Sequence, residues 1–313
     1  MSDSMLPTAT LGRTGLDVTR LGYGAMAIHG VPPSGKAISD DHARDVLHSV
    51  MDAGINFIDT SNCFGRSEEF IGNHLGARRS EYFLATKCGC RPYDEYQKYY
   101  LAGESVPAEE RHIWSRENIF RGLEESLRRL QTDYVDVMQV HGPGLADWER
   151  EGLFDSLDEM RRQGKVRWVG MSARNPDELP AFLDMNVFDV FQVAYSAYSR
   201  QQEGWISLAA ERGAGTIIRG GVAKGEPEEE TGATDRWRES FENKGLDELR
   251  EDGESRTAFV LRFTLSHPDI HTVIVGSQSP SHIADNARVA RLGPLTTATY
   301  EEAKRRLGGA ATT

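Results

Sequence analysis

The sequence predicts a single (β/α)8 barrel with an N-terminal β-hairpin and long loops after its third and seventh strands. Eight short apolar runs alternate with amphipathic stretches along a chain of 313 residues, a length that suits one such barrel. The runs are almost continuously apolar, as expected for parallel strands covered on both faces. An open, doubly wound sheet is the alternative. It normally has a Gly-rich phosphate loop after the first strand, and Gly22-Tyr23-Gly24-Ala25-Met26-Ala27 lacks that fingerprint.

The expected elements follow one another in the order that a barrel requires. The eight apolar runs predict strands at residues 20–26, 56–59, 82–87, 134–141, 166–172, 190–196, 215–220 and 272–276. Amphipathic stretches predict helices at 41–53, 115–130, 153–163 and 201–212. The second of these has Ser115 as its expected cap.

The ends of the chain are expected to add a hairpin and a helix to one domain, residues 1–313. Residues 8–11 and 17–21 flank Gly12-Arg13-Thr14-Gly15, which predicts a hairpin that closes the bottom of the barrel. The expected bounds are about 18–293 for the barrel, 8–22 for the hairpin and about 297–308 for a C-terminal helix. The loops 89–114 and 221–254 follow strands, so both should overhang the C-terminal mouth, where barrels build active sites.

Composition excludes several classes of function. The net charge is −12 and the pI about 5.3, which disfavours binding to nucleic acid or an anionic membrane. The apolar stretches are too short to span a bilayer, and Met1–Thr10 lacks a signal-peptide layout, so we expect a cytoplasmic protein. Three cysteines in a chain this long argue against a disulfide scaffold. The sequence does not predict an oligomeric state.

Three ionisable residues end neighbouring predicted strands. Asp59, Lys87 and His141 close the second, third and fourth runs, so a barrel brings them to one rim. Each alone has an ordinary explanation as a helix cap, a solvated cation or a satisfied polar group. Together they predict a site. A Lys beside an Asp can lower the pKa of a phenol or polarise a carbonyl, and a neutral His can orient a substrate oxygen.

The motifs around these residues resemble those of the aldo-keto reductase superfamily over nearly the whole chain. They include Gly54-Ile55-Asn56-Phe57-Ile58-Asp59-Thr60-Ser61, then Phe64-Gly65, Ala85-Thr86-Lys87 and Gln139-Val140-His141. Similar motifs are Leu11-Gly12-Arg13-Thr14-Gly15-Leu16, residues 126–136, residues 164–172, Gln192-Val193-Ala194-Tyr195 and Val273-Ile274-Val275-Gly276-Ser277 with Asp285-Asn286. The resemblance implies hydride transfer from a nicotinamide dinucleotide to an aldehyde or ketone.

The resemblance also implies roles for individual residues. Asp59 and Lys87 would tune the proton donor, His141 would orient the carbonyl, and Tyr195 would stack under the nicotinamide. Ser172 and Gln192 would hold its carboxamide, and Arg219 would meet a phosphate. The expected cofactor-binding residues are Gly24, Ala25, Met26, Asp59, Ser172, Gln192, Tyr195, Arg219, Gly220, Gly221, Val222, Gly276, Ser277, Ser279, His282, Asp285 and Asn286. We expect NADPH as cofactor with NADH as an alternative, because neutral Gln278 and His282 stand where Arg or Lys often binds the 2′-phosphate.

Phe64 stands at the position of the family's catalytic tyrosine and lacks the hydroxyl that would donate a proton. Such a loss typically costs on the order of 10²–10⁴-fold in rate. Four explanations remain open: a weakened or binding-only barrel, a loop tyrosine that reaches in (Tyr93, Tyr96, Tyr99 or Tyr100), water or His141 as donor, or a substitution introduced at position 64. The rival function is therefore a nucleotide-binding barrel that serves as a sensor or subunit. Lyase or isomerase chemistry through the Lys87 amine is a third hypothesis.

Cys63, Cys88 and Cys90 adjoin Phe64 and Lys87, so all three should lie at the mouth near His141. Their spacing lacks the CxxC pattern of common zinc sites. Thiols that shape a pocket are the favoured interpretation, and we predict no metal from the sequence. Redox-sensitive thiols and a zinc site remain as alternatives.

Overall fold

The computed structural model describes residues 5–29, 38–92, 95, 107, 110–173, 175–226 and 232–308. Within these ranges, eight parallel strands close into a barrel in the order β10-β3-β4-β5-β6-β7-β8-β9. The strands are β3 (Leu21–Gly24), β4 (Phe57–Asp59), β5 (Phe83–Cys88), β6 (Val135–Val140), β7 (Val166–Ser172), β8 (Val190–Ala194), β9 (Gly215–Arg219) and β10 (Thr272–Val275). The predicted barrel and its strands are confirmed, with ends shifted by no more than two residues.

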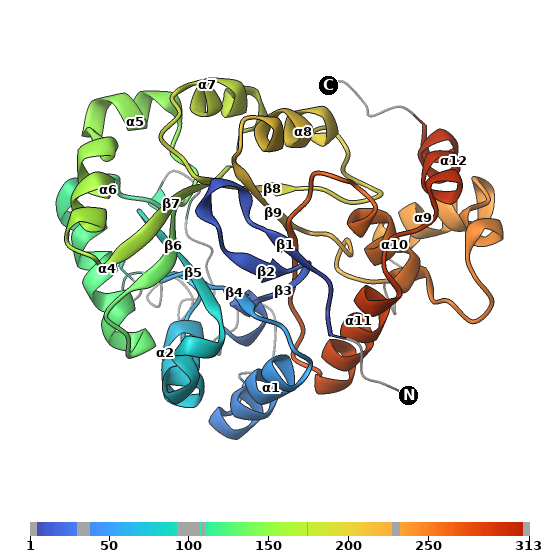
Figure 1. The fold of residues 1–313 in the computed structure, drawn as a ribbon, viewed down its shortest axis with the longest axis horizontal. Helices are drawn as coiled ribbons and strands as arrows, with labels where there is room; N and C mark the ends of the chain where they lie inside the picture. The colour runs from blue at the N-terminus through green and yellow to red at the C-terminus, as the bar shows by residue number, and fades with distance from the viewer. Residues whose placement is uncertain are drawn as a thin grey trace.

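Helices surround the strands and cover their outer faces (Figure 1). They are α1 (Asp40–Asp52), α2 (Ser67–Leu75), α4 (Arg116–Leu130), α5 (Leu145–Glu151), α6 (Leu153–Arg162), α7 (Leu179–Asp184), α8 (Glu203–Glu211), α9 (Gly232–Arg238), α10 (Arg256–Leu265), α11 (Pro280–Leu292) and α12 (Thr297–Leu307). Ser115 caps α4 as predicted, because its side chain accepts from the N–H of Asn118. None of the helices in the described ranges is long and apolar enough to cross a bilayer.

An antiparallel hairpin closes the bottom of the barrel, as predicted. It pairs β1 (Thr8–Thr10) with β2 (Asp17–Thr19) and lies across the strands in Figure 1. Leu11 and Val18 are fully buried in the apolar cluster that fills the lower interior. Arg13 joins the hairpin to the region before β9: its backbone N–H donates to the Gly213 carbonyl at 2.7 Å, and its Nη2 donates to the Arg212 carbonyl at 2.7 Å.

The interior of the barrel has an apolar lower layer and a polar upper layer. The lower layer contains Phe57, Ala85, Val137, Val190 and Ile217. Because strand side chains alternate, the residues two positions later on four of these strands also point inward. Those residues are Asp59, Lys87, Gln139 and Gln192, all buried. Gly170 makes room for them, since a Cβ there would lie 3.2 Å from the Gln139 side chain and 3.0 Å from the Val190 carbonyl.

Candidate active site

Lys87 and Asp59 form a buried ion pair at the upper ends of β5 and β4. The Lys87 Nζ lies 2.6 Å from Asp59 Oδ2 and donates to the Thr60 carbonyl at 2.8 Å. The exposed fractions of the two side chains are 2% and 3%. A buried ion pair survives only when additional hydrogen bonds satisfy its remaining polar atoms. The surroundings of Asp59 supply them.

Two glutamines complete the shell of the Asp59 carboxylate. Gln139 Nε2 and Gln192 Nε2 both donate to Asp59 Oδ1, at 2.7 and 2.8 Å. Gln192 Oε1 in turn accepts from the Ser172 hydroxyl at 3.0 Å. The network therefore runs from β5 through β4 to β8 and β7, and it orients Asp59, Ser172 and Gln192 together. Sequence reasoning missed Gln139, although its inward position on β6, two residues after Val137, was a readable signal.

The Phe64 ring lies between the lysine and the histidine. Its centroid is 5.0 Å from Lys87 Nζ and 6.3 Å from the His141 ring centroid, edge to face. The four residues expected at the catalytic centre are therefore neighbours at one rim. The ring lies beside both Lys87 and His141 and has no proton to donate.

His141 follows β6 and faces two thiols. Its Nδ1 lies 3.0 Å from Cys90 Sγ and 3.8 Å from Cys63 Sγ. A hydrogen bond from the Cys90 thiol holds the pKa of Cys63 well below its usual range, while burial raises the pKa of Cys90. Cys88 was also expected at the mouth, but it packs in the outer core, the apolar cluster between the strands and the surrounding helices. Burial raises the pKa of its thiol to about 12. The thiols of Cys63 and Cys90 therefore contact the Nδ1 atom of the His141 ring, not Nε2.

The ends of β7 and β9 present the next group of expected cofactor residues. Arg219 ends β9, and its Nη2 donates to the Ala173 carbonyl at 3.2 Å. Gly220 follows in a left-handed conformation with φ of +73°, and a Cβ there would meet no atom within 4 Å. Gly221 is buried, since a Cβ there would lie 2.3 Å from Val273, and Val222 is half-buried against the core. The chain thus turns sharply beside open space at the rim.

The ends of β10 and β3 approach each other closely at the same rim. A Cβ on Gly276 would lie 2.6 Å from the Gly24 carbonyl. Ala25 is buried and Met26 is 60% exposed. Ser279 caps α11 by accepting from the His282 N–H, and the Ser277 hydroxyl lies 3.4 Å from His282 Nδ1. Further along α11, exposed Asp285 pairs with Arg288 at 2.7 Å and Asn286 is half-buried.

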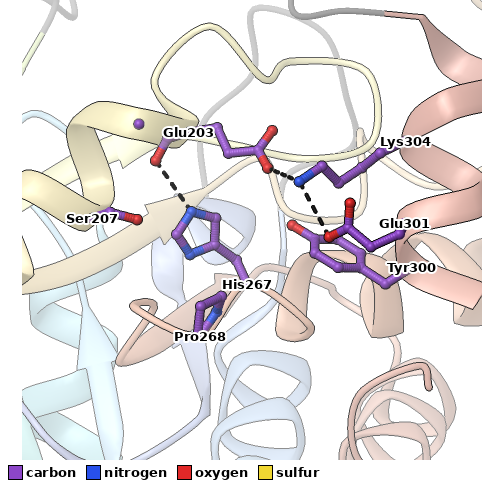
Figure 2. A pocket seen from close by; sticks show the side chains of 8 residues that line it. Glu203, Ser207, His267, Pro268, Tyr300, Glu301 and Lys304 are labelled. Atoms are coloured by element: carbon purple, nitrogen blue, oxygen red, sulfur yellow. Dashed lines mark hydrogen bonds and ion pairs between the residues drawn. The ribbon is translucent and has the colours of Figure 1, made fainter. Parts of the chain in front are cut away.

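Tyr195 does not lie at this rim, which corrects its expected position under the nicotinamide. It is fully buried, its ring packs against Phe263 and His267 in the outer layer, and its hydroxyl lies 2.7 Å from the Tyr300 hydroxyl. Gln192 points inward on β8, so the residue three positions later points outward. Tyr300 and His267 line a pocket of about 600 Å³ between α8 and α12 on the outside of the barrel (Figure 2).

The residues at the rim fit a nicotinamide dinucleotide in extended form. A polar side chain ends β7, another lies two residues before the end of β8, an open glycine turn follows β9, and the N-terminus of α11 follows β10. Amide and hydroxyl groups suit a carboxamide, and glycine turns and helix N-termini suit phosphates. The loop residues Tyr93, Tyr96, Tyr99 and Tyr100, expected as alternative donors, lie outside the described residues.

Comparisons with known proteins agree with this fold and identify its family. A model of the aldo/keto reductase family matches residues 20–306. The uncharacterized oxidoreductase YqkF of Bacillus subtilis is 28% identical over 91% of this chain and 92% of its own length. A probable voltage-gated potassium channel subunit beta of Oryza sativa is 27% identical over 92% of both chains. The solved holo form of the aldo-keto reductase AKR11C1 from Bacillus halodurans superposes with a TM-score of 0.81, at 26% identity and 98% coverage of both chains.

Proposed function

The chain belongs to the aldo/keto reductase family, and we propose that it reduces a small aldehyde or ketone at the rim where Lys87, Phe64 and His141 meet. Nicotinamide-dependent carbonyl reduction is the activity of that family. The observation that carries the proposal is the buried Lys87–Asp59 pair, 2.6 Å apart, within 5.0 Å of the Phe64 ring. A fixed cation in a site of low dielectric stabilises developing negative charge far better than one in water.

The cofactor would be held by Ser172, Gln192, the turn at Gly220 and the start of α11, and it supplies a hydride when bound. The chain's own residues provide everything else. The ammonium of Lys87, held in place by its ion pair with Asp59, would face the carbonyl oxygen as charge develops there. His141 Nε2–H would donate a hydrogen bond to the same oxygen and give it a proton, and solvent water would return that proton to the imidazole, leaving hydroxide in the bulk solvent. Phe64 keeps bulk water away from the carbonyl carbon and donates nothing.

Replacing Phe64 with tyrosine tests this arrangement directly. A phenol placed beside Lys87 acquires a lowered pKa and becomes a proton donor, so Phe64→Tyr should raise kcat on a panel of aldehydes by about 10²–10⁴-fold. NADPH affinity, measured by quenching of tryptophan fluorescence, should change less than about twofold because the nicotinamide residues are untouched. An unchanged kcat would mean that another acid already serves or that the reaction is different.

The rival function is a nucleotide-binding barrel with little turnover, and Phe64 is the observation that favours it. One relative is named as a channel subunit, which suits a binding role. Tight NADPH binding without detectable aldehyde reduction, in the wild type and in Phe64→Tyr alike, would support this rival. Amine chemistry through Lys87 is less well supported, because its ammonium is buried and donates to both Asp59 and the Thr60 carbonyl.

We also propose NADPH as the cofactor, with only weak discrimination against NADH. The first turn of α11 offers His282 and no Lys or Arg, and the nearby cation Arg288 is paired with Asp285. The ratio of kcat/KM for NADPH to that for NADH should therefore be below about tenfold, and His282→Arg should raise it by supplying a bidentate phosphate partner. A ratio above about 10² in the wild type would contradict weak discrimination.

Free thiols at the site also suit a reducing compartment, which supports the cytoplasm.

A further inference from the structure

Three potential metal ligands meet at the mouth of the barrel beside Phe64. The Sγ atoms of Cys63 and Cys90 and the Nδ1 atom of His141 all lie within 4.8 Å of one another. They come from three separate segments: the loop after β4, the turn after β5 and the end of β6. Cys90 is fully buried, and Cys63 and His141 are half-buried. Residues 63, 90 and 141 therefore converge through the fold rather than through a local motif, which explains why their spacing in the sequence gave a weak signal.

Bonds to the surrounding backbone and side chains hold these ligands in place. The Cys90 carbonyl accepts from Asn118 Nδ2 at 3.0 Å, and the His141 N–H donates to the Cys88 carbonyl at 3.1 Å. The Ser61 hydroxyl lies 3.1 Å from Cys63 Sγ and 3.7 Å from Cys90 Sγ. A metal site benefits from such a supporting shell, because ligands that are already oriented lose less freedom on binding.

We propose that Cys63, Cys90 and His141 bind a zinc ion, with the fourth position facing the mouth for water or a substrate oxygen. Two thiolates and one imidazole form a Cys₂His set, which occurs in catalytic zinc sites. Tetrahedral zinc places such ligand atoms about 3.5–3.8 Å apart, which small side-chain rotations reach from the observed 3.0 and 3.8 Å. Soft sulfur ligands select zinc over magnesium or calcium, which prefer carboxylates.

A zinc ion on Nδ1 would also fix the tautomer of the His141 imidazole. A neutral imidazole carries one proton, so coordination at Nδ1 leaves that proton on Nε2, the nitrogen that a substrate would meet. A metal therefore strengthens the hydrogen-bond donor at a rim where Phe64 supplies none. This consequence rests on the proposed reductase function, whereas zinc binding itself does not.

Cobalt substitution tests the site without an activity assay. The full chain is purified under reducing conditions, freed of metal with a chelator and titrated with Co²⁺. One equivalent should produce a thiolate-to-cobalt charge-transfer band in the near ultraviolet and visible bands of tetrahedral cobalt. Zn²⁺ should abolish these bands. Fully reduced protein that titrates for three thiols yet shows no charge-transfer band would overturn the proposal.

Matched variants locate the ligands. Cys63→Ser and Cys90→Ser should each lose the charge-transfer band, and Cys88→Ala should keep it because Cys88 belongs to the outer core. A band that persists in Cys63→Ser or Cys90→Ser, or disappears in Cys88→Ala with normal circular dichroism, would overturn the assignment. If a serine variant fails to fold, the wild-type titration decides alone. Cobalt binding in a chain without turnover would leave this inference intact while removing the reductase function, so the two failures are distinguishable.

Discussion

The two interior layers of the barrel are built from the same strands and differ in almost every physical respect. The lower layer is apolar and is sealed by the hairpin residues Leu11 and Val18. The upper layer begins about 6–7 Å further along each strand and holds a buried ion pair with amide donors. Burying hydrocarbon stabilises the fold, whereas burying charge is costly unless every polar atom is paired. The lower layer therefore stabilises the fold, and the upper layer is where we propose that the reaction takes place.

The strongest way to break this division is to remove the charge of Lys87. Lys87→Met leaves the Asp59 carboxylate buried without its cation, so the free energy of unfolding should fall by about 3–5 kcal/mol. Turnover should fall by about 10²-fold or more, since the cation that we propose faces the carbonyl is lost. Urea denaturation and aldehyde reduction measure the two effects, using whichever of the wild type and Phe64→Tyr is more active as the parent.

Adding Asp59→Asn to Lys87→Met separates the two effects. The double variant buries no charge, so it should recover most of the lost stability while remaining inactive. If the double variant is as unstable as the single one, charge burial is not the cause. If either variant turns over normally, Lys87 does not take part in the reaction.

A substitution in the lower layer should lower stability without lowering activity. Leu11→Ala removes a fully buried side chain from the floor, so the free energy of unfolding should fall by about 2–5 kcal/mol. The kcat of the folded protein should stay unchanged because the upper layer is not touched. Leu208→Ala, at a position of α8 that is 37% exposed, is the matched control and should cost less than about 0.5 kcal/mol. A reduced kcat in folded Leu11→Ala would show that the two layers are coupled.

The smallest expected effect distinguishes two glutamines that bind the same oxygen. Gln139 and Gln192 both donate to Asp59 Oδ1, but Gln192 alone also accepts from Ser172. Gln192→Leu should weaken NADPH binding by about 3–10-fold, the equivalent of one hydrogen bond, and Gln139→Leu by less than about twofold. Fluorescence titration measures both dissociation constants. Equal losses of affinity would mean that the hydrogen bond between Ser172 and Gln192 makes no separate contribution to NADPH binding.

The sequence predicted the upper layer well where side chains follow strand periodicity. Asp59, Lys87 and His141 were placed at one rim because parallel strands end on the same side of a barrel. The same periodicity, applied to β8, would have turned Tyr195 outward, since Gln192 and Tyr195 are an odd number of positions apart. The family resemblance suggested that Tyr195 stacks under the nicotinamide, whereas the alternation of side chains along the strand predicts that Tyr195 points away from the barrel interior.

Other features depended on contacts that a linear sequence does not contain. The sequence placed Cys63, Cys88 and Cys90 near His141, but it did not show that Cys63 and Cys90 would meet the imidazole while Cys88 would pack in the core. The role of Gly170 is similar, because its lack of a side chain matters only beside Gln139. Such juxtapositions are tertiary, so local spacing carries little information about them.

The bonds from Arg13 to residues 212 and 213 have a consequence for synthesis in the cell. Arg13 cannot form these bonds until residues about 200 positions later in the chain have been translated. Contacts of such long sequence separation form late and slow the search for the native state. A nascent chain stalled before β9 emerges therefore holds its hairpin through earlier contacts, such as the bonds of Asp17 and Thr19 with Asn56, and still lacks those of Arg13.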